Sequence, residues 1–221
     1  MSVVPGKTGI MANRAGQARR TRAGVTSGRM TERGRRHTIQ EWLEQPPERR
    51  LELIDGEFVE KAAPDFPHGL AQMSIGIALS SFIDPKPGGS GPGGGGWWFA
   101  TEVDIQLGAN GYRPDVAGWR LERCPNGIEG WPIVLRPDWI CEVLSKSNRH
   151  HDTDLKLRRY HEAGVPHYWL LDHDLQTLKV FRHEPEGYVN VLNAERGQPI
   201  RAEPFDAIEL RVEALLGRRS R

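Results

Sequence analysis

The order of predicted helices and strands is the feature of this sequence that most limits its fold. A hairpin comes first, followed by a long helix, a group of strands, a second helix and further strands. This mixed order is typical of an α/β or α+β domain built around one central mixed sheet. We therefore expect a single domain in which helices flank the sheet and a hairpin lies near its N-terminal end.

The hairpin is predicted at 51–60, where two alternating runs flank Asp55 and Gly56. Asp-Gly between alternating runs is the strongest short-range hairpin signal. A two-residue turn at this point places Glu52 opposite Val59.

Apolar periodicity and end signals predict helices at 37–44, 68–83 and 152–163, and a short closing helix at 212–216. The helix at 68–83 carries two apolar rows, and so wide a stripe predicts a largely buried helix. The rows are Leu70, Met73 and Ile77, and Ile75, Leu79 and Phe82.

Further strands are predicted at 97–107, 112–120, 138–144, 167–172 and 177–182. The first two are expected to pair with each other, and the last two to form a second hairpin. In the strand at 138–144, alternation divides the side chains between two faces. Trp139, Cys141 and Val143 lie on one face, and Ile140, Glu142 and Leu144 on the other.

Composition excludes several classes of protein. The chain has 221 residues, and none of its apolar runs approaches the roughly 20 residues that a membrane-spanning helix needs. Two cysteines, Cys124 and Cys141, are too few for a disulfide-rich scaffold, and they indicate free thiols in a cytoplasmic protein, with one bridge left open. The Gly-rich loop at 84–96 lacks the Lys-Ser/Thr ending of a phosphate-binding loop.

Charge is unevenly distributed along the chain. Residues 1–36 hold nine basic residues and one acidic residue, a net charge of +8, which leaves −7 for 37–221 because the whole chain carries +1. We expect 1–36 to be a disordered basic tail and 37–221 the folded domain. Three interpretations of the tail stay open: a solvated segment, an arm that contacts nucleic-acid phosphates, or a transit peptide. The net negative charge of the domain argues against tight non-specific DNA binding.

Acidic residues lie at the ends of two predicted strands. Asp115 opens one strand, and Glu142 lies between apolar residues of another. Paired carboxylates of this kind suit Mg²⁺ or Mn²⁺, and a nearby lysine such as Lys156 can orient a water or stabilise charge on a phosphate. The structural alternative for Lys156 is an ion pair with Asp152 at i, i+4, and Tyr160 shares the same helix face.

Five motifs in order resemble the Uma-two family, which is named for restriction endonucleases and grouped with the PD-(D/E)XK nucleases. They are ELIDGE, PDFPHG, RPDV, CEVLSKS and DLKLRRYHEAGVPHYWLLD, and the resemblance runs from about His37 to about Gly217. It implies a restriction-endonuclease-like fold, a mixed sheet between helices, and a phosphodiesterase site that uses Mg²⁺ or Mn²⁺ on DNA.

The resemblance also implies roles for particular residues. Asp115 would be the first metal-binding acid and Glu142 the second. The lysine expected two residues after the second acid is replaced by Leu144, and the family pattern instead places a lysine at Lys156. Two hairpin acids, Glu57 and Glu52, match the family motif, and either could support the site; His68 matches a motif histidine without an assigned role.

Two functional hypotheses follow from these residues. The first is a Mg²⁺-dependent endodeoxyribonuclease, for which a homodimer would suit palindromic cutting. The second is a non-catalytic module that keeps the fold and binds nucleic acid or protein; the missing lysine favours it. The remaining histidines have no zinc-ligand spacing, and Trp97 and Trp98 are interpreted as packing residues, with base stacking as an alternative.

Overall fold

The computed structural model describes residues 35–83, 96–144 and 151–217, without the side chains of 151–153. Most of the predicted basic tail, most of the Gly-rich loop and the end of the CEVLSKS motif lie outside the described residues. No helix in the described part of the chain is both long enough and apolar enough to cross a membrane.

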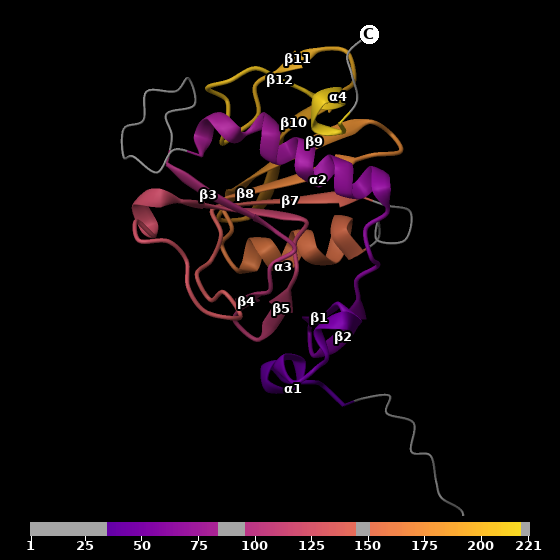
Figure 1. Cartoon of the computed structure of the whole chain (residues 1–221), viewed down its shortest axis with the longest axis vertical. Helices are drawn as coiled ribbons and strands as arrows, with labels where there is room; N and C mark the ends of the chain where they lie inside the picture. Colours follow the sequence, from indigo (N-terminus) through magenta and orange to yellow (C-terminus); the bar gives the residue numbers. More distant parts are fainter. Residues whose placement is uncertain (1–34, 84–95, 145–150, 218–221) are drawn as a thin grey trace, which may run out of the picture. The chain divides into compact units, whose positions relative to one another are not determined.

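Helices and strands alternate along the chain much as the sequence predicts (Figure 1). The helices are α1 (Ile39–Leu43), α2 (Phe66–Ala78), α3 (Leu157–Glu162) and α4 (Val212–Leu215). The first strands are β1 (Leu51–Ile54), β2 (Glu57–Glu60), β3 (Trp97–Thr101), β4 (Ile105–Leu107), β5 (Asn110–Tyr112) and β6 (Val116–Arg120). The later strands are β7 (Trp139–Leu144), β8 (His167–Asp172), β9 (Thr177–Glu184), β10 (Gly187–Glu195), β11 (Pro199–Ile200) and β12 (Leu210–Arg211).

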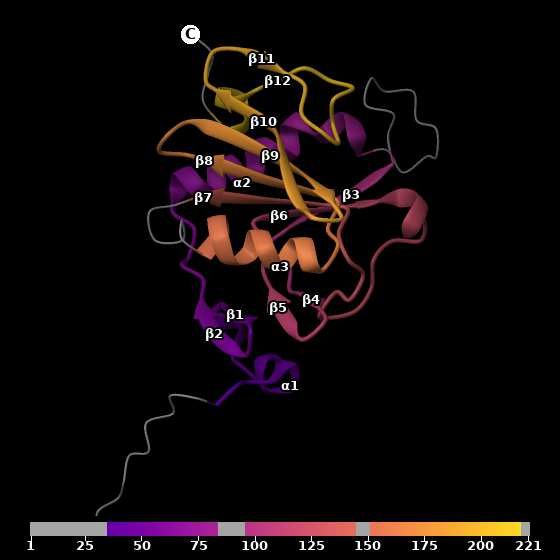
Figure 2. The same cartoon turned by 180° about the vertical axis from the view of Figure 1, so that it is seen from behind.

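A six-stranded mixed sheet forms the centre, in the order β10-β9-β8-β7-β6-β3. The strands β7 and β8 are parallel and the other neighbouring pairs are antiparallel. Parallel neighbours need a long crossover, and here α3 provides it. Figures 1 and 2 show α2 on one face of the sheet and α3 on the other, so the predicted fold class is confirmed.

The strand β7 is buried along its whole length because apolar layers cover both faces of the sheet. Trp139, Cys141 and Val143 belong to the core on the α2 side. Ile140 and Leu144 belong to the core on the α3 side. The predicted alternation is confirmed, and it places Glu142 in the apolar layer beneath α3.

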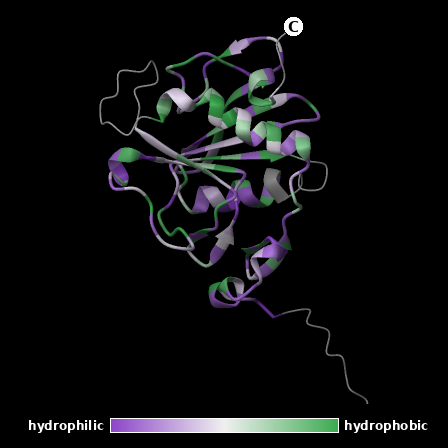
Figure 3. Cartoon of the chain, viewed as in Figure 1, coloured by the Kyte–Doolittle hydropathy of each residue, from purple (hydrophilic) through white to green (hydrophobic). Residues whose placement is uncertain are grey.

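The helix α2 begins two residues before the predicted start, because the Asp65 carboxylate caps it by accepting from the His68 N–H at 3.0 Å. The predicted row of Ile75, Leu79 and Phe82 is buried, with Leu79 and Phe82 lying after the end of α2. The other apolar row is not buried: Met73 is 58% and Ile77 64% exposed. The prediction of a largely buried helix is therefore wrong, because only one face of α2 packs on the sheet, although the helix is strongly apolar (Figure 3).

A second sheet, in the order β2-β1-β5-β4, lies at the N-terminal end of the described domain. The hairpin has the predicted register, with Glu52 opposite Val59, and both Asp55 and Gly56 have positive φ at its turn. The helix α1 starts at a capping box built by Thr38 and Glu41.

The predicted pairing of 97–107 with 112–120 is divided between the two sheets. The outer parts, β3 and β6, pair in the central sheet, whereas β4 and β5 pair in the small sheet. The chain changes sheet at Glu102 and again at Pro114, and the Glu102 N–H donates to the Pro114 carbonyl at 3.1 Å. This change places Glu102 and Asp115 at the junction of the two sheets.

Both cysteines are buried free thiols. Trp97 is buried as well: its ring stacks on Phe99, and the Arg120 guanidinium lies 4.8 Å above it. The interpretation of Trp97 as a packing residue is confirmed, because its ring lies within the core beside Phe205. The predicted hairpin of β8 and β9 and the closing helix α4 are also confirmed.

Two glycines should respond in opposite directions to substitution by alanine. At Gly111 a Cβ atom would lie 2.6 Å from the Trp42 ring, whereas at Gly76, in α2, nothing lies within 4 Å. We expect Gly111→Ala to lower the free energy of unfolding by about 1–3 kcal/mol through overpacking. Gly76→Ala should raise it by about 0.5–1 kcal/mol by restricting the unfolded chain. Urea unfolding of both variants measures the difference, and a Gly111→Ala variant as stable as the parent would contradict the packing at Trp42.

Candidate active site

Four acidic and two basic side chains meet where the small sheet, the central sheet and the π-helical turns His151–Lys156 before α3 come together. The acids are Glu52 in β1, Glu102 after β3, Asp115 before β6 and Glu142 in β7, and the bases are Lys61 after β2 and Lys156 before α3. All except Glu102 are at most 5% exposed, so their charges are removed from water. Such burial requires close pairing.

Asp115 is held by hydrogen bonds on both carboxylate oxygens. Its Oδ2 accepts from the Val143 N–H of the adjacent strand at 2.6 Å. Its Oδ1 contacts three side-chain nitrogens, Lys61 Nζ at 2.7 Å, His68 Nε2 at 2.9 Å and Gln72 Nε2 at 3.1 Å. Residues of α2 and of the chain after β2 thus converge on the first acid.

Glu142 links the two strands to the helical segment. Its Oε2 accepts from the Asp115 N–H at 3.3 Å, and its Oε1 accepts from Lys156 Nζ and from the Tyr160 hydroxyl, each at 3.0 Å. Lys156 Nζ lies 2.9 Å from Glu52 Oε2 as well, so this ammonium bridges two carboxylates. The other oxygen of Glu52 accepts from the Arg113 N–H at 2.8 Å.

Lys61 forms a second cationic centre. Its Nζ lies 2.7 Å from Asp115 Oδ1, 3.6 Å from Glu102 Oε2 and 3.9 Å from Glu142 Oε2. It also donates to the Arg113 carbonyl at 2.5 Å.

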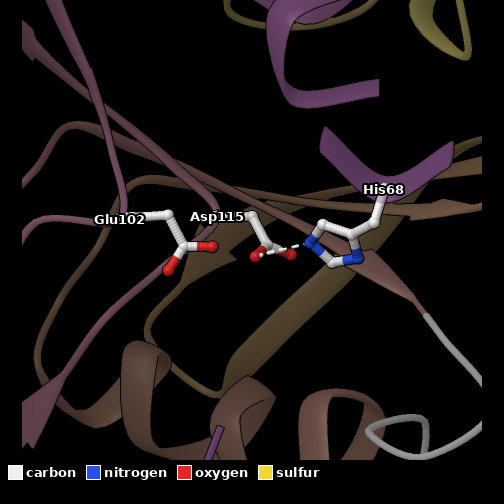
Figure 4. A group of neighbouring side chains, drawn as sticks. All are labelled: His68, Glu102 and Asp115. Atoms are coloured by element: carbon white, nitrogen blue, oxygen red, sulfur yellow. Dashed lines mark hydrogen bonds and ion pairs between the residues drawn. The ribbon is translucent and has the colours of Figure 1, made fainter. Parts of the chain in front are cut away.

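Glu102 closes the site toward solvent. Gln72 Nε2 donates to its Oε1 and Arg50 donates to its Oε2, each at 2.7 Å. Figure 4 shows Asp115 between Glu102 and His68, and one ligand atom of each lies within 4.8 Å of the others. This group has donor atoms that could hold a metal ion.

The pKa shifts indicate that the buried acid and base are both ionised at neutral pH. Burial alone would raise the pKa of Asp115, but Lys61 and the hydrogen bond from His68 outweigh it and lower that pKa. Burial alone would lower the pKa of Lys61, but Asp115 and Glu142 outweigh it and raise that pKa. Burial, followed by the charge of Glu142, raises the pKa of Tyr160, which keeps its hydroxyl a donor.

The donor set fits a divalent cation. Four carboxylates face the two lysines Lys61 and Lys156, with Arg50 at the rim, so acidic groups are in excess. Carboxylate oxygens are the ligands that Mg²⁺ and Mn²⁺ prefer. Lys61 Nζ lies 2.7 Å from Asp115 Oδ1 and 3.9 Å from Glu142 Oε2, and one ligand atom each of Glu102 and His68 lies within 4.8 Å of that of Asp115.

The structure brings together most of the residues predicted from the sequence. They are Asp115, Glu142, Lys156, Glu52 and Tyr160. Of the two hairpin acids, Glu57 is exposed and forms no hydrogen bond or ion pair with this cluster among the described side chains. Lys156 is 2% exposed and pairs with Glu52 and Glu142. The side chain of Asp152, the alternative partner predicted from the sequence, lies outside the described residues.

Sequence reasoning missed Lys61, Gln72 and Glu102, and left His68 without a role. Gln72 lies one helical turn after His68, a spacing that would have placed it on the same face of α2. Lys61 and Glu102 have no comparable signal, because each follows the end of a strand and reaches the site only through the junction of the two sheets.

Comparisons with known proteins identify the family of the chain and a solved structure that shares its fold. The model of the Uma2 family, described as "Putative restriction endonuclease", matches residues 37–213. A crystal structure described as "a putative nuclease belonging to DUF820", from Anabaena variabilis ATCC 29413, shares the fold with a TM-score of 0.65 at 22% identity. The match covers 81% of this chain and 97% of that chain. No curated protein sequence matches the chain.

Removal of the Lys156 ammonium should destabilise the domain strongly. Lys156→Met leaves the buried carboxylates of Glu52 and Glu142 without this shared partner, so we expect a loss of about 3–5 kcal/mol in the free energy of unfolding at pH 7. The matched control is Lys179→Met, because Lys179 is exposed in β9 and should change stability by less than about 0.5 kcal/mol. Urea unfolding followed by circular dichroism makes the comparison; equal losses in both variants would refute the bridging role.

The stability of the domain should depend on pH through Asp115. Its pKa in the folded protein lies below the ordinary value of 3.8, so its carboxylate stabilises the fold above about pH 4. This contribution is lost as the pH falls toward the lowered pKa. We expect Asp115→Asn to be less stable than the parent at pH 7, and the difference to narrow below about pH 4. Unfolding curves between pH 7 and pH 3 test this, and a difference that stays constant would contradict it.

Proposed function

Because the chain belongs to the Uma2 family, we propose that it is an endonuclease that hydrolyses phosphodiester bonds of DNA with Mg²⁺ or Mn²⁺. The observation that carries the proposal is the contact of Lys156 Nζ with Glu142 Oε1 at 3.0 Å, beside Asp115, which directly precedes the neighbouring strand β6. Two strand acids and one amine are the set that this chemistry requires.

The displaced lysine is accounted for by the layering of the sheet. Leu144 stands two residues after Glu142, on the same face of β7, and packs in the core beneath α3. Lys156 comes from the turns before that helix and approaches the same face from above. The Lys156 amine therefore contacts the Glu142 carboxylate from the segment that covers the sheet. In the usual pattern a lysine at the position of Leu144 would make this contact.

In this proposal Asp115 and Glu142 hold the cation, with Glu102 and His68 as the nearest further donors. A bound divalent cation would polarise the scissile phosphate and lower the pKa of a water molecule. Lys156 would hold the attacking water or stabilise charge on the phosphate, and its ion pair with Glu52 fixes the position of its ammonium. Tyr160 orients Glu142 through its hydroxyl hydrogen bond.

The substrate class follows from the same chemistry. The site offers acids for a metal and a lysine for a phosphate, so a phosphodiester is the group that it fits. Residues 37–221 carry a formal net charge of −7, which disfavours tight binding to DNA of any sequence through the phosphates alone. A two-fold dimer would suit the cutting of palindromic sites.

A non-catalytic binding module is the second candidate. The observation that favours it is that Oδ1 of Asp115 contacts three side-chain nitrogens. This oxygen therefore already has hydrogen-bond and ion-pair partners within the protein. Such a module would keep the buried charge network for stability and would need no divalent cation.

Cleavage of supercoiled plasmid and of single-stranded DNA with Mg²⁺ or Mn²⁺ tests the proposal. We expect the parent to nick or cut, and Asp115→Asn, Glu142→Gln and Lys156→Met to lose at least about 100-fold in rate, because each removes a charge from the site. Glu60→Gln is the control, since Glu60 is exposed on β2. Circular dichroism verifies that each variant is folded.

The results separate the two candidates. Cutting by Asp115→Asn at the parental rate would show that the assignment is wrong. A folded parent that neither cuts nor binds Mn²⁺ in a calorimetric titration would favour the non-catalytic module.

A further inference from the structure

The ammonium group of Lys61 lies in a cage of oxygen atoms from four residues. Three are carboxylate oxygens, of Asp115, Glu102 and Glu142, at 2.7, 3.6 and 3.9 Å, and the fourth is the Arg113 carbonyl oxygen at 2.5 Å. Carboxylate and carbonyl oxygens converging on one point make the environment in which hard cations bind. The point at the centre of this cage is occupied by a nitrogen of the protein itself.

Burial and backbone contacts fix Lys61 in this position. Its side chain is 3% exposed. Its backbone N–H donates to the Arg50 carbonyl at 2.9 Å, which anchors the chain at the end of β2. The charge of Asp115 is thereby balanced without a metal. The free domain needs such a balance, because an unpaired buried carboxylate would cost several kcal/mol.

The two lysines of the site, Lys61 and Lys156, lie near different oxygens of the Glu142 carboxylate. Lys61 lies near Oε2 of Glu142, whereas Lys156 contacts Oε1 of the same carboxylate and Oε2 of Glu52. The Lys61 ammonium therefore occupies the position between the carboxylates of Asp115 and Glu142. The Lys156 ammonium lies beside that position.

We propose that Lys61 is a built-in occupant of the divalent-cation position between Asp115 and Glu142, and that a divalent cation binds there by displacing its ammonium group. The inference rests on the metal site of the proposed function and adds a competition to it. The flexible four-carbon stem of lysine permits such a movement. Residues Ala62, Ala63 and Pro64, directly after Lys61, are exposed and give the displaced ammonium a route to water.

Calorimetric titration of the full chain with Mn²⁺ tests the competition without any cleavage. We expect Lys61→Met to bind Mn²⁺ roughly tenfold more tightly than the parent, because the cation no longer competes with a buried ammonium. Lys156→Met is the matched control: it also removes one buried positive charge next to Glu142 but leaves the cage occupied. Its gain in affinity should be clearly smaller.

The outcomes distinguish this inference from the proposed metal site. If Asp115→Asn binds Mn²⁺ as tightly as the parent, the site at Asp115 is wrong and the inference falls with it. If Asp115→Asn loses binding but Lys61→Met gains nothing, or gains no more than Lys156→Met, the site stands and the competition is refuted.

A second measurement uses the parent chain and does not depend on the folding of a variant. Acetic anhydride acetylates exposed amines, and mass spectrometry reads the modification of the peptides that contain Lys61 and Lys156. We expect Ca²⁺ or Mn²⁺ to raise the acetylation rate of Lys61 at least about fivefold, since the displaced amine enters water, and to leave Lys156 protected. Lys61 that stays protected at saturating cation would overturn the inference.

Discussion

The burial of carboxylates inside a sheet that is covered on both faces is the constraint on which the rest of this structure depends. Asp115 and Glu142 are each 1% exposed, and the desolvation of each ion costs several kcal/mol unless partners offset it. The strands alone cannot supply these partners, apart from backbone N–H groups such as that of Val143. The cations come from the end of β2 and from the turns before α3, so charge neutralisation ties both outer segments to the central sheet.

The sequence predicts those parts of the molecule that local rules control. The register of the first hairpin follows from the Asp-Gly turn, and the two faces of β7 follow from strict alternation in Trp139–Leu144. The pairing of Asp115 with Glu142 was expected from strand ends, and the structure places the two residues in hydrogen-bond contact. The first two inferences need only a turn type or a period, and the third also needs the two strands to be neighbours.

The parts that were missed depend on how distant segments meet. Glu102 and Lys61 enter the site because the strands at 97–107 and 112–120 divide between two sheets, a change of direction that periodicity does not encode. The exposure of Met73 and Ile77 in α2 was missed for a similar reason, because it too depends on the tertiary arrangement. An apolar pattern shows which faces can be buried, but only the tertiary arrangement decides which face is covered.

The dispersal of the site along the chain has a consequence for protein synthesis. Arg113 and Glu52 contact each other across 61 residues, Asp115 and Lys61 across 54, and Lys156 lies 14 residues beyond Glu142. The contacts across 54 and 61 residues form late, because the chain must first lose the entropy of closing long loops. A ribosome-bound chain that has not yet exposed Lys156 holds acids without their full set of cations. The complete site therefore forms only when synthesis of the domain is nearly finished.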